Sequence, residues 1–113
     1  MENILEQSTN LSNEIYNSKC YKDYINAKAK LEKDEEMYGN FLEFRKLQIN
    51  NRKNLSDKET PFDTIKYLSK LQSDLMLNDI VRDFFICKRE FLDLYNKVTT
   101  IVYSKLNFDF MEA

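Results

Sequence analysis

An apolar heptad pattern between Ile80 and Leu106 is the feature of this sequence that most constrains its fold. Its members recur at alternating spacings of four and three residues: Ile80, Phe84, Cys87, Phe91, Leu94, Val98 and Ile101. An α-helix has about 3.6 residues per turn, so a stripe with a period of about 3.5 keeps facing one neighbour only if two helices coil around each other. The pattern therefore predicts a long helix of coiled-coil character that packs lengthwise against another helix.

A second apolar stripe lies beside the first on the same predicted helix. It comprises Val81, Phe85, Leu92, Tyr95, Val98 and Val102. Together the two stripes form an apolar face that is wider than the seam of a two-helix coiled coil. We therefore expect this helix to be buried on more than one side.

The composition is that of a helix-rich protein with a single core. The chain has 113 residues, of which 42% are hydrophobic, 32% are charged, one is Gly and one is Pro. A length of this order fits one domain over residues 1–113. So few Gly and Pro residues leave little turn chemistry, which excludes an all-β fold, and the apolar content excludes disorder. The predicted fold class is therefore all-α.

The residue types that carry most catalysis and metal binding are missing or too few. The chain has no His, so catalytic triads and zinc sites that need imidazole are excluded. Its two cysteines, Cys20 and Cys87, supply too few ligands for a metal or iron–sulfur site within one chain. We expect both to be buried and reduced. The sequence therefore predicts no enzyme, no catalytic residue, no metal and no cofactor.

Signals for export or membrane insertion are not found in the sequence. The chain begins Met-Glu-Asn-Ile-Leu-Glu, with acidic residues where a signal peptide carries basic ones. No apolar run approaches the roughly 18 residues of a membrane span. The expected location is therefore the cytoplasm.

Helical spacing and capping residues divide the chain into segments. In chain order these are a short helix over 3–17, a long arm over 18–51, a polar loop over 52–60, a helix over 61–75 and the heptad helix over 80–107. Ser18, Thr60 and Asn78 each precede a helix and carry a side-chain oxygen that can accept from its first free N–H groups. Pro61 stands at the first helical position, where its missing N–H is not needed.

The acidic run Glu32–Glu36 within the long arm has two interpretations. It can continue the helix as a solvated stretch, or Asp34 can act as a new cap with Glu35 and Glu36 in the first turn of a restarted helix. We favour a helix that is continuous or merely kinked. Gly39 weakens this arm by about 1 kcal/mol relative to Ala without forcing a break.

The two halves of the sequence match in residue type when one is shifted by sixty positions. The shift places Ser18 over Asn78 and the step Asp23-Tyr24 over Asp83-Phe84. Each half then consists of a short helix, a capped junction and a long helix. The pattern indicates an internal repeat, or a pseudo-symmetric hairpin.

The resulting fold prediction is a long antiparallel helical hairpin with short flanking helices, packing as a helical-bundle dimer. The heptad helix should pack against the arm 18–51, but one arm cannot cover both of its stripes. A second copy of the chain is the simplest further cover, because two-fold homodimers are the commonest oligomers. The predicted oligomer interface comprises Tyr24, Phe41, Phe84, Phe91, Leu94, Val98 and Ile101.

A family resemblance is carried by the order of residues in both halves. The first half has Ser18, Tyr21, Tyr24, Ala27, Leu31 and Asp34, followed by the segment 41–47. Asn78, Val81, Phe84, Cys87 and Phe91 repeat this order in weaker form. In combination, and over nearly the whole chain, the pattern resembles the YlbF/YmcA family of small helical bacterial proteins.

The resemblance implies a non-enzymatic regulatory protein. Members of this family form homo- or hetero-oligomers, and some act with sister proteins as accessory factors of ribonuclease Y in mRNA processing, with effects on competence, biofilm formation and sporulation. Some family complexes carry iron–sulfur clusters with ligands near a carboxyl terminus. Here residues 107–113 contain no cysteine, and this departure from the family argues against a cluster in this chain. The implied partners are the chain itself, sister family proteins and a ribonuclease, without a membrane and with nucleic acid at most indirectly.

A basic stretch around the polar loop offers a second functional hypothesis. Its cations are Arg45, Lys46, Arg52, Lys53 and Lys58, against the two acids Glu43 and Asp57. Such a cluster can bind RNA phosphates or an acidic protein, and strong salt dependence would mark the former. The interpretation that we favour is a solvated helix end whose cations suit the negative end of the helix dipole. The alternative to a regulatory adaptor is therefore an RNA-binding helical module.

Overall fold

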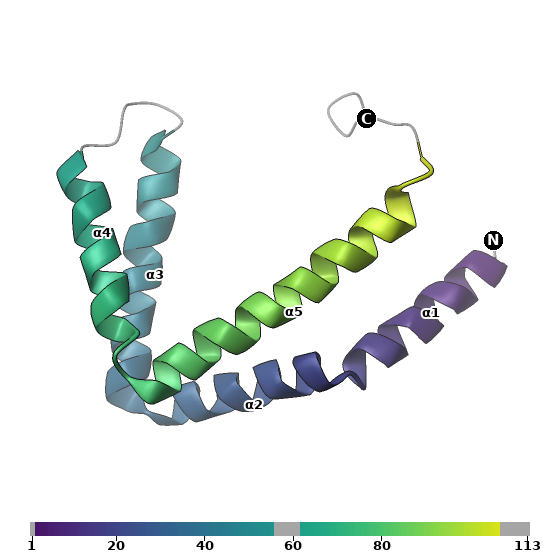
Figure 1. Cartoon of the computed structure of the whole chain (residues 1–113), viewed down its shortest axis with the longest axis horizontal. Coiled ribbons are helices and arrows are strands. Elements are labelled where there is room, and N and C mark those ends of the chain that lie inside the picture. The colour runs from purple at the N-terminus through teal and green to yellow at the C-terminus, as the bar shows by residue number, and fades with distance from the viewer. Residues whose placement is uncertain (1, 56–61, 107–113) are drawn as a thin grey trace.

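The structure, a computed structural model, describes residues 2–55 and 62–106, and these form five α-helices without a strand (Figure 1). The helices are α1 (Glu2–Tyr16), α2 (Lys19–Lys33), α3 (Glu35–Leu55), α4 (Phe62–Leu75) and α5 (Asp79–Tyr103). The predicted all-α class is confirmed. Of the helices in the described ranges, none combines the length and the apolar character that crossing a membrane requires.

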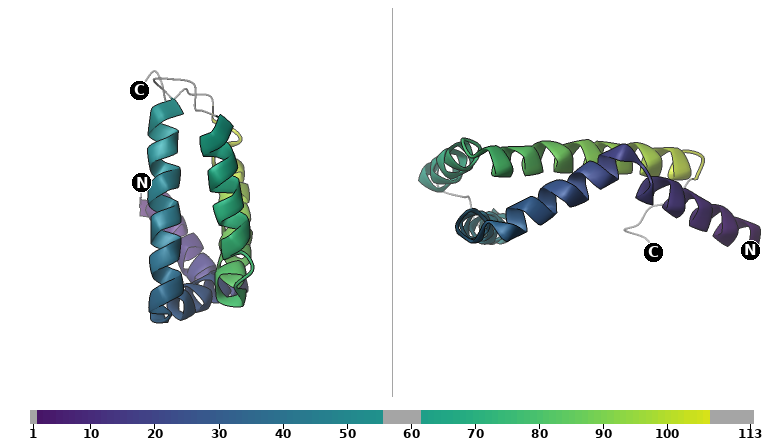
Figure 2. Two further views of the ribbon diagram at one scale, coloured as in Figure 1. Left: turned by 90° about the vertical axis from the view of Figure 1, so that its left-hand side faces the viewer. Right: turned by 90° about the horizontal axis from the view of Figure 1, so that it is seen from below.

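The helices form two antiparallel pairs that diverge from a common vertex. α2 packs along α5, and α3 packs along α4. The α3–α4 pair stands away from α5, so the chain has the outline of a V, and α1 extends α2 beyond a bend (Figures 1 and 2). The molecule measures 50 × 36 × 17 Å along its principal axes. This outline leaves long helical faces uncovered.

Side-chain caps set the start of α2 and of α5, as predicted. The Ser18 hydroxyl accepts from the backbone N–H of Tyr21 at 3.4 Å. The Asn78 side-chain oxygen accepts from two N–H groups, those of Ile80 at 3.0 Å and Val81 at 3.1 Å. Each cap satisfies donors that the first helical turn leaves without a partner.

The long arm predicted over 18–51 is interrupted at Asp34. α2 ends at Lys33, and Asp34 has extended backbone angles of φ −90° and ψ 95°. Its carboxylate accepts from the backbone N–H of Met37 at 3.1 Å, which caps the start of α3. The prediction of a continuous or merely kinked helix is therefore wrong, and the restart at Asp34 is correct. The physical reason is that an Asp side chain can bond to the backbone two or three residues on, in competition with the helix.

The hydrophobic core lies at the vertex, where α2, α3, α4 and α5 meet. Its buried members among the described residues are Ala27, Leu31, Phe41, Phe44, Leu75, Val81 and Phe84. Leu31 and Val81 are 1% and 0% exposed. The ring of Phe84 packs edge-on against Phe41 at 5.2 Å between centroids and lies 5.8 Å from the ring of Tyr24. Aromatic contacts at the vertex therefore join the α3–α4 pair to the α2–α5 pair.

The two junctions sixty residues apart share their backbone hydrogen bonding. Ser18 N–H donates to the Ile15 carbonyl at 3.0 Å, and Asn78 N–H donates to the Leu75 carbonyl at 3.1 Å. The halves differ in what covers their short helices, because α4 packs along α3 whereas α1 contributes no buried residue. The repeat therefore holds at the junctions and fails in the environment of α1.

Candidate protein-interaction surfaces

The predicted interface residues nearest the vertex lie mainly inside the chain. Phe41 and Phe84 are 6% and 5% exposed, so they have little surface left for a partner. Tyr24 and Phe91 are half-buried and stack on each other, with 5.5 Å between ring centroids and an angle of 10° between planes. These four residues join α2, α3 and α5 within one chain.

The rest of the predicted interface lies on the half of α5 that extends beyond α2. Phe91 contacts Tyr21, near the start of α2, at 5.3 Å between ring centroids. Past this point Leu94 and Val98 are half-buried and Ile101 is 73% exposed. We call these three residues the distal seam. The heptad stripe thus continues where its partner helix within the chain has ended.

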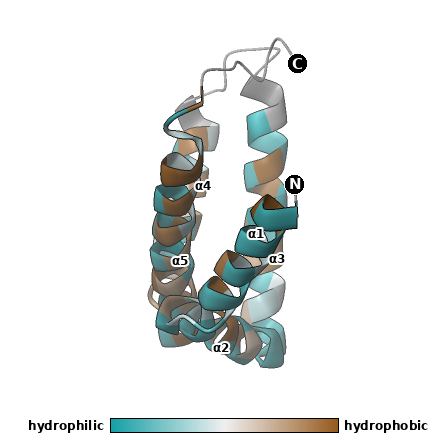
Figure 3. Cartoon of the chain, turned by 90° about the vertical axis from the view of Figure 1, so that its right-hand side faces the viewer, coloured by the Kyte–Doolittle hydropathy of each residue, from teal (hydrophilic) through white to brown (hydrophobic). Residues whose placement is uncertain are grey.

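α1 carries an apolar stripe that the chain covers only in part, since Leu11 and Ile15 are half-buried. Ile4 and Leu5 are 69% and 63% exposed, and Tyr16 is 65% exposed. Hydrophobic and hydrophilic turns alternate along this helix (Figure 3). Its charged residues are Glu2, Glu6 and Glu14, with no Lys or Arg. α1 is therefore an acidic, amphipathic helix with an open apolar side.

Two adjoining grooves lie where α3, α4 and α5 meet, and we call them the inner grooves. The first is lined by Phe44, Gln48, Asn51, Arg52, Ile65, Leu68, Ser69 and Gln72. The second is lined by Gln72, Met76, Phe85, Ile86, Lys88, Arg89 and Leu92. Gln72 belongs to both, so the grooves form one continuous surface on the inside of the V.

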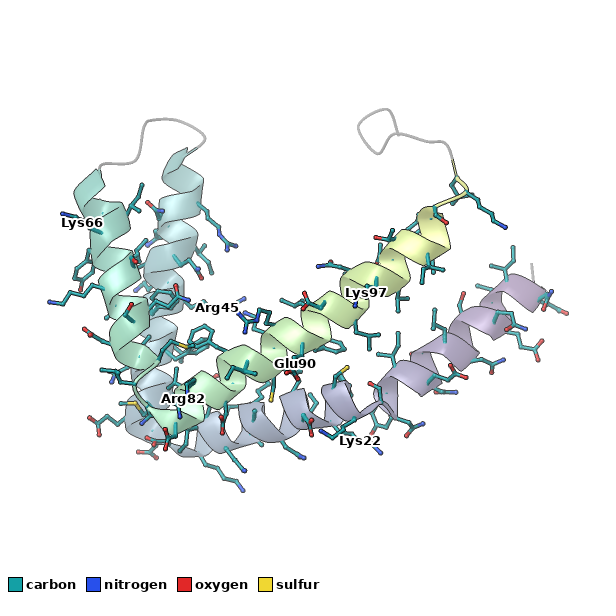
Figure 4. The ribbon with its side chains drawn as sticks, viewed as in Figure 1. Lys22, Arg45, Lys66, Arg82, Glu90 and Lys97 are labelled. Carbon is teal, nitrogen blue, oxygen red and sulfur yellow. The ribbon has the colours of Figure 1, made fainter. Side chains whose placement is uncertain are left out.

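The inner grooves are basic. Arg52 lines one groove, Lys88 and Arg89 line the other, and Arg45 extends from α3 toward α5 (Figure 4). No carboxylate appears in the lining of either groove. Burial, together with the positive charges of Arg45 and Arg52, lowers the pKa of Lys88. Lys88 of α5 therefore lies within the electrostatic influence of two cations of α3.

Only some residues of the predicted basic surface lie near the inner grooves. Arg45, Lys46 and Arg52 lie on α3, where Arg45 and Arg52 are solvent-accessible. Lys58 lies outside the residues that the structure describes, as does the side chain of Lys53. That the basic stretch forms a partner or RNA surface stays a prediction. Of its members, Arg45 and Arg52 lie near Lys88, a cation of α5.

Sequence reasoning missed Lys88 and Arg89, which come from the heptad helix. The heptad pattern singles out the apolar residues around them and gives these two cations no role. A usable signal exists: the helical neighbours of Lys88 at three and four positions are Phe84, Phe85, Phe91 and Leu92. A lysine without an acid at any of those positions has no ion pair on its own helix.

The two thiols are free, and both are half-buried rather than fully buried as expected. Burial and then the negative charge of Asp23 raise the pKa of Cys87. Within residues 2–55 and 62–106, no cluster of three or more His, Cys, Asp or Glu side chains is placed to hold a metal ion.

Comparisons with known proteins agree with this architecture. A UPF0342 protein of Streptococcus uberis, SUB0718, is 24% identical over 106 residues, which is 93% of this chain and 95% of that protein. A chain in the X-ray crystal structure of Bacillus subtilis RicA in complex with RicF has the same fold, with a TM-score of 0.63 and 20% identity. The likeness covers 88% of this chain and 90% of that one.

The family comparison covers most of the sequence. Residues 4–107 match the family described as "Control of competence regulator ComK, YlbF/YmcA". That range runs from the first predicted helix to the end of the heptad helix and includes both capped junctions. The family is one of regulatory proteins, which confirms the predicted regulatory class. The resemblance drawn from residue order is thereby confirmed, and the chain belongs to the YlbF/YmcA family.

Proposed function

We propose that this protein is a non-enzymatic, oligomeric regulatory adaptor that acts in the cytoplasm by binding other helical proteins. The observation that carries the proposal is the distal seam. Its spacing continues the heptad stripe that packs on α2, yet Ile101 is 73% exposed. A coiled-coil seam is stable only when its apolar residues insert between those of a facing helix. The distal seam therefore calls for a helix from another subunit.

The size of the exposed surface supports the same proposal. The chain exposes 9530 Å², whereas a compact monomer of 13.6 kDa exposes about 6,600 Å². Its radius of gyration is 18.1 Å, against about 13 Å for a compact domain of this length. A chain this open gains stability by covering apolar surface between subunits.

The proposed partners are a second copy of the chain and sister members of its family. In the similar crystal structure RicA is in complex with RicF, so that relative has a protein partner. By family membership we extend the proposal to an accessory role with a ribonuclease in mRNA processing, and to control of competence, biofilm formation and sporulation. Pulling the tagged protein from its native cytosol and identifying what accompanies it tests this extension. Recovery of the bait alone would contradict it.

Self-association is tested by light scattering of the full chain and of Ile101→Glu. We expect the wild type to have at least twice the mass of one chain at micromolar concentration, and Ile101→Glu to be monomeric. Because Ile101 is 73% exposed, the change leaves the fold of one chain intact. The matched control is Thr100→Glu, which adds the same charge at the neighbouring, exposed position on another face of α5. A monomeric wild type would overturn the proposed self-association.

RNA binding by the basic surface is a second candidate, favoured by the absence of carboxylates from the inner grooves. An electrophoretic shift measured at two salt concentrations separates it from the adaptor role. Phosphate contacts release counterions, so binding by Arg45 and Arg52 would weaken steeply as salt rises. No shift at the lower salt concentration would eliminate this candidate.

A further inference from the structure

The charge of the inner grooves differs from that of two other grooves formed by the described residues. A groove on the other side of the α3–α4 pair includes Glu43 and Asp74 in its lining. A groove between α2 and α5 includes Asp23, Asp79 and Asp83. The chain has 19 acidic and 17 basic residues, so a continuous surface with cations and no acid is a local segregation of charge. Such a surface attracts a negatively charged partner.

The cations of the inner grooves have no counterion within the described residues. No ion pair is recorded there for Arg45, Arg52, Lys88 or Arg89, and the pKa of Lys88 is lowered rather than raised. Like charges brought together at a half-buried site oppose folding. An acidic ligand would remove that penalty, because each carboxylate offsets the repulsion between the cations around it.

The groove floor favours a helix over a nucleic acid as the ligand. Apolar side chains from three helices line it, among them Leu68, Phe85 and Leu92. Single-stranded RNA is held by exposed aromatic rings on which bases stack. Here Phe44 is only 3% exposed and Phe85 is packed edge-on against Phe41 at 5.8 Å between centroids. A cationic rim around an apolar floor suits an amphipathic helix with acidic flanks.

One helix of this chain has the matching properties. α1 has three Glu residues and no basic residue, and its first half exposes Ile4 and Leu5. In the internal repeat α1 corresponds to α4, which packs along α3. α5 runs straight to Tyr103 and provides no bent continuation against which α1 could pack in the same way. α1 is therefore the one short helix of the repeat that its own chain leaves without such cover.

We propose that α1 of one copy docks in the inner grooves of a second copy, with Glu2 and Glu6 facing Arg45 and Arg52 and with Ile4 and Leu5 on the apolar floor. This inference rests on the self-association proposed above and names a second contact for it. The exchange is reciprocal, because each copy offers one α1 and one pair of grooves. A reciprocal contact closes a two-fold dimer and leaves no open end for a filament.

Charge reversal on each side of the contact tests the inference. The dimer dissociation constant is measured by sedimentation at low salt for the full chain, for Arg45→Glu/Arg52→Glu and for Glu2→Lys/Glu6→Lys. We expect each double variant to raise the constant at least about tenfold, since each faces like charge across the contact. The chain that carries all four changes should return to within about threefold of the wild type.

The rescue separates a broken contact from a damaged helix. Basic residues at a helix amino terminus weaken the helix, so Glu2→Lys/Glu6→Lys alone could act by fraying α1. Fraying would not be repaired by Arg45→Glu/Arg52→Glu, whereas an ionic contact would be. Failure of the rescue would therefore overturn the inference.

A control variant tests whether total charge matters. Lys22→Glu/Lys28→Glu changes the net charge by the same amount at two exposed positions on α2, away from the inner grooves. We expect its dissociation constant to match that of the wild type. An increase as large as that of the groove variant would attribute the effect to net charge and overturn the inference.

The remaining outcomes distinguish this inference from the function on which it rests. A monomeric wild type would overturn both the proposed self-association and the docking of α1. A wild type that dimerises through the distal seam, with dissociation constants unaffected by the reversals, removes only the docking of α1. If Arg45→Glu/Arg52→Glu abolishes the retention of poly(U) RNA at low salt and leaves the dimer intact, the inner grooves bind nucleic acid and the inference is overturned.

Discussion

At the scale of single residues, the two capping side chains differ in how much they stabilise their helices. Asn78 accepts two backbone hydrogen bonds at 3.0 and 3.1 Å, whereas Ser18 accepts one at 3.4 Å. The Ser18 hydroxyl also donates to the carbonyl of Ile15 at 2.6 Å, which ties it to the end of α1. Asn78 is therefore the stronger cap, and it precedes the helix that contributes the buried Val81 and Phe84 to the core.

Replacing Asn78 by Ala should lower the free energy of unfolding by about 1 kcal/mol, because both N–H groups lose their acceptor. Ser18→Ala should cost less. Urea unfolding monitored by circular dichroism measures both, and Asn78→Asp, which keeps an accepting oxygen, is the control. Equal losses for the two Ala variants would contradict the ranking.

Gly39 is a residue where substitution should stabilise the protein. It lies within α3, does not have a positive φ, and an added Cβ would meet nothing within 4 Å. Ala lowers the entropy of the unfolded chain and favours the helix, so Gly39→Ala should raise the free energy of unfolding by about 0.5–1 kcal/mol. A lower midpoint in urea would show that the position has a role that its empty surroundings do not reveal.

The lowered pKa of Lys88 makes a prediction for the pH dependence of stability. Its usual value is 10.5, and burial followed by the charges of Arg45 and Arg52 lowers it in the folded chain. Between the lowered value and 10.5 the unfolded chain binds more protons at this group, so its contribution to stability rises with pH in that window. Arg45→Gln/Arg52→Gln should flatten the rise. Melting temperatures of both proteins across the window measure the difference, and parallel curves would contradict it.

At the scale of elements, α5 has two halves with different environments. The half that begins at Asp79 packs on α2 and includes the buried Val81 and Phe84. The half beyond Phe91 carries the distal seam. Apolar cover within the chain ends part of the way along a single continuous helix, so local stability should fall along its length.

Hydrogen exchange can follow this gradient residue by residue. In monomeric Ile101→Glu, amides of α5 beyond Phe91 should exchange faster than those near Val81, because the distal turns open without loss of core packing. In the wild type, which we propose to be oligomeric, the distal amides should be protected. Equal protection in both proteins would show that no partner helix covers the distal seam.

The elements also show how far sequence reasoning reaches. The caps and the heptad helix could be predicted because they depend on residues within a few positions of each other. The break at Asp34 could not be chosen, since the local sequence suits both a continued and a restarted helix. The Asp34 cap makes the restart possible, and the restarted helix buries Phe41 and Phe44 in the core at the vertex, against residues far away in the sequence. The inner grooves depend on the break at Asp34. The proximity of Arg45 and Arg52 to Lys88 could therefore not be predicted from the sequence either.

At the scale of the whole molecule, burial of apolar surface is uneven. It exposes several large apolar side chains, and its buried core is confined to the vertex. The self-association proposed above would link folding to association, because anything that binds only the folded chain stabilises it by mass action.

The linkage predicts that thermal stability depends on protein concentration. Raising the wild-type concentration about a hundredfold, from roughly 1 to 100 µM, should raise the melting temperature by several degrees. The melting temperature of Ile101→Glu should stay constant over the same range, and that of Thr100→Glu should follow the wild type. A wild-type value that does not move with concentration would argue against coupled folding and assembly.

The extended residue Asp34 has a further consequence for how such a molecule could change its partners. Asp34 and the Met76–Asn78 turn are the two connections between the α3–α4 pair and the rest of the molecule. Together they set the angle between the α3–α4 pair and the α2–α5 pair. A substitution at Asp34 would therefore change this angle. It would alter which partner helix fits between the two pairs, and hence the specificity of the protein, although every residue on the binding surfaces stays the same.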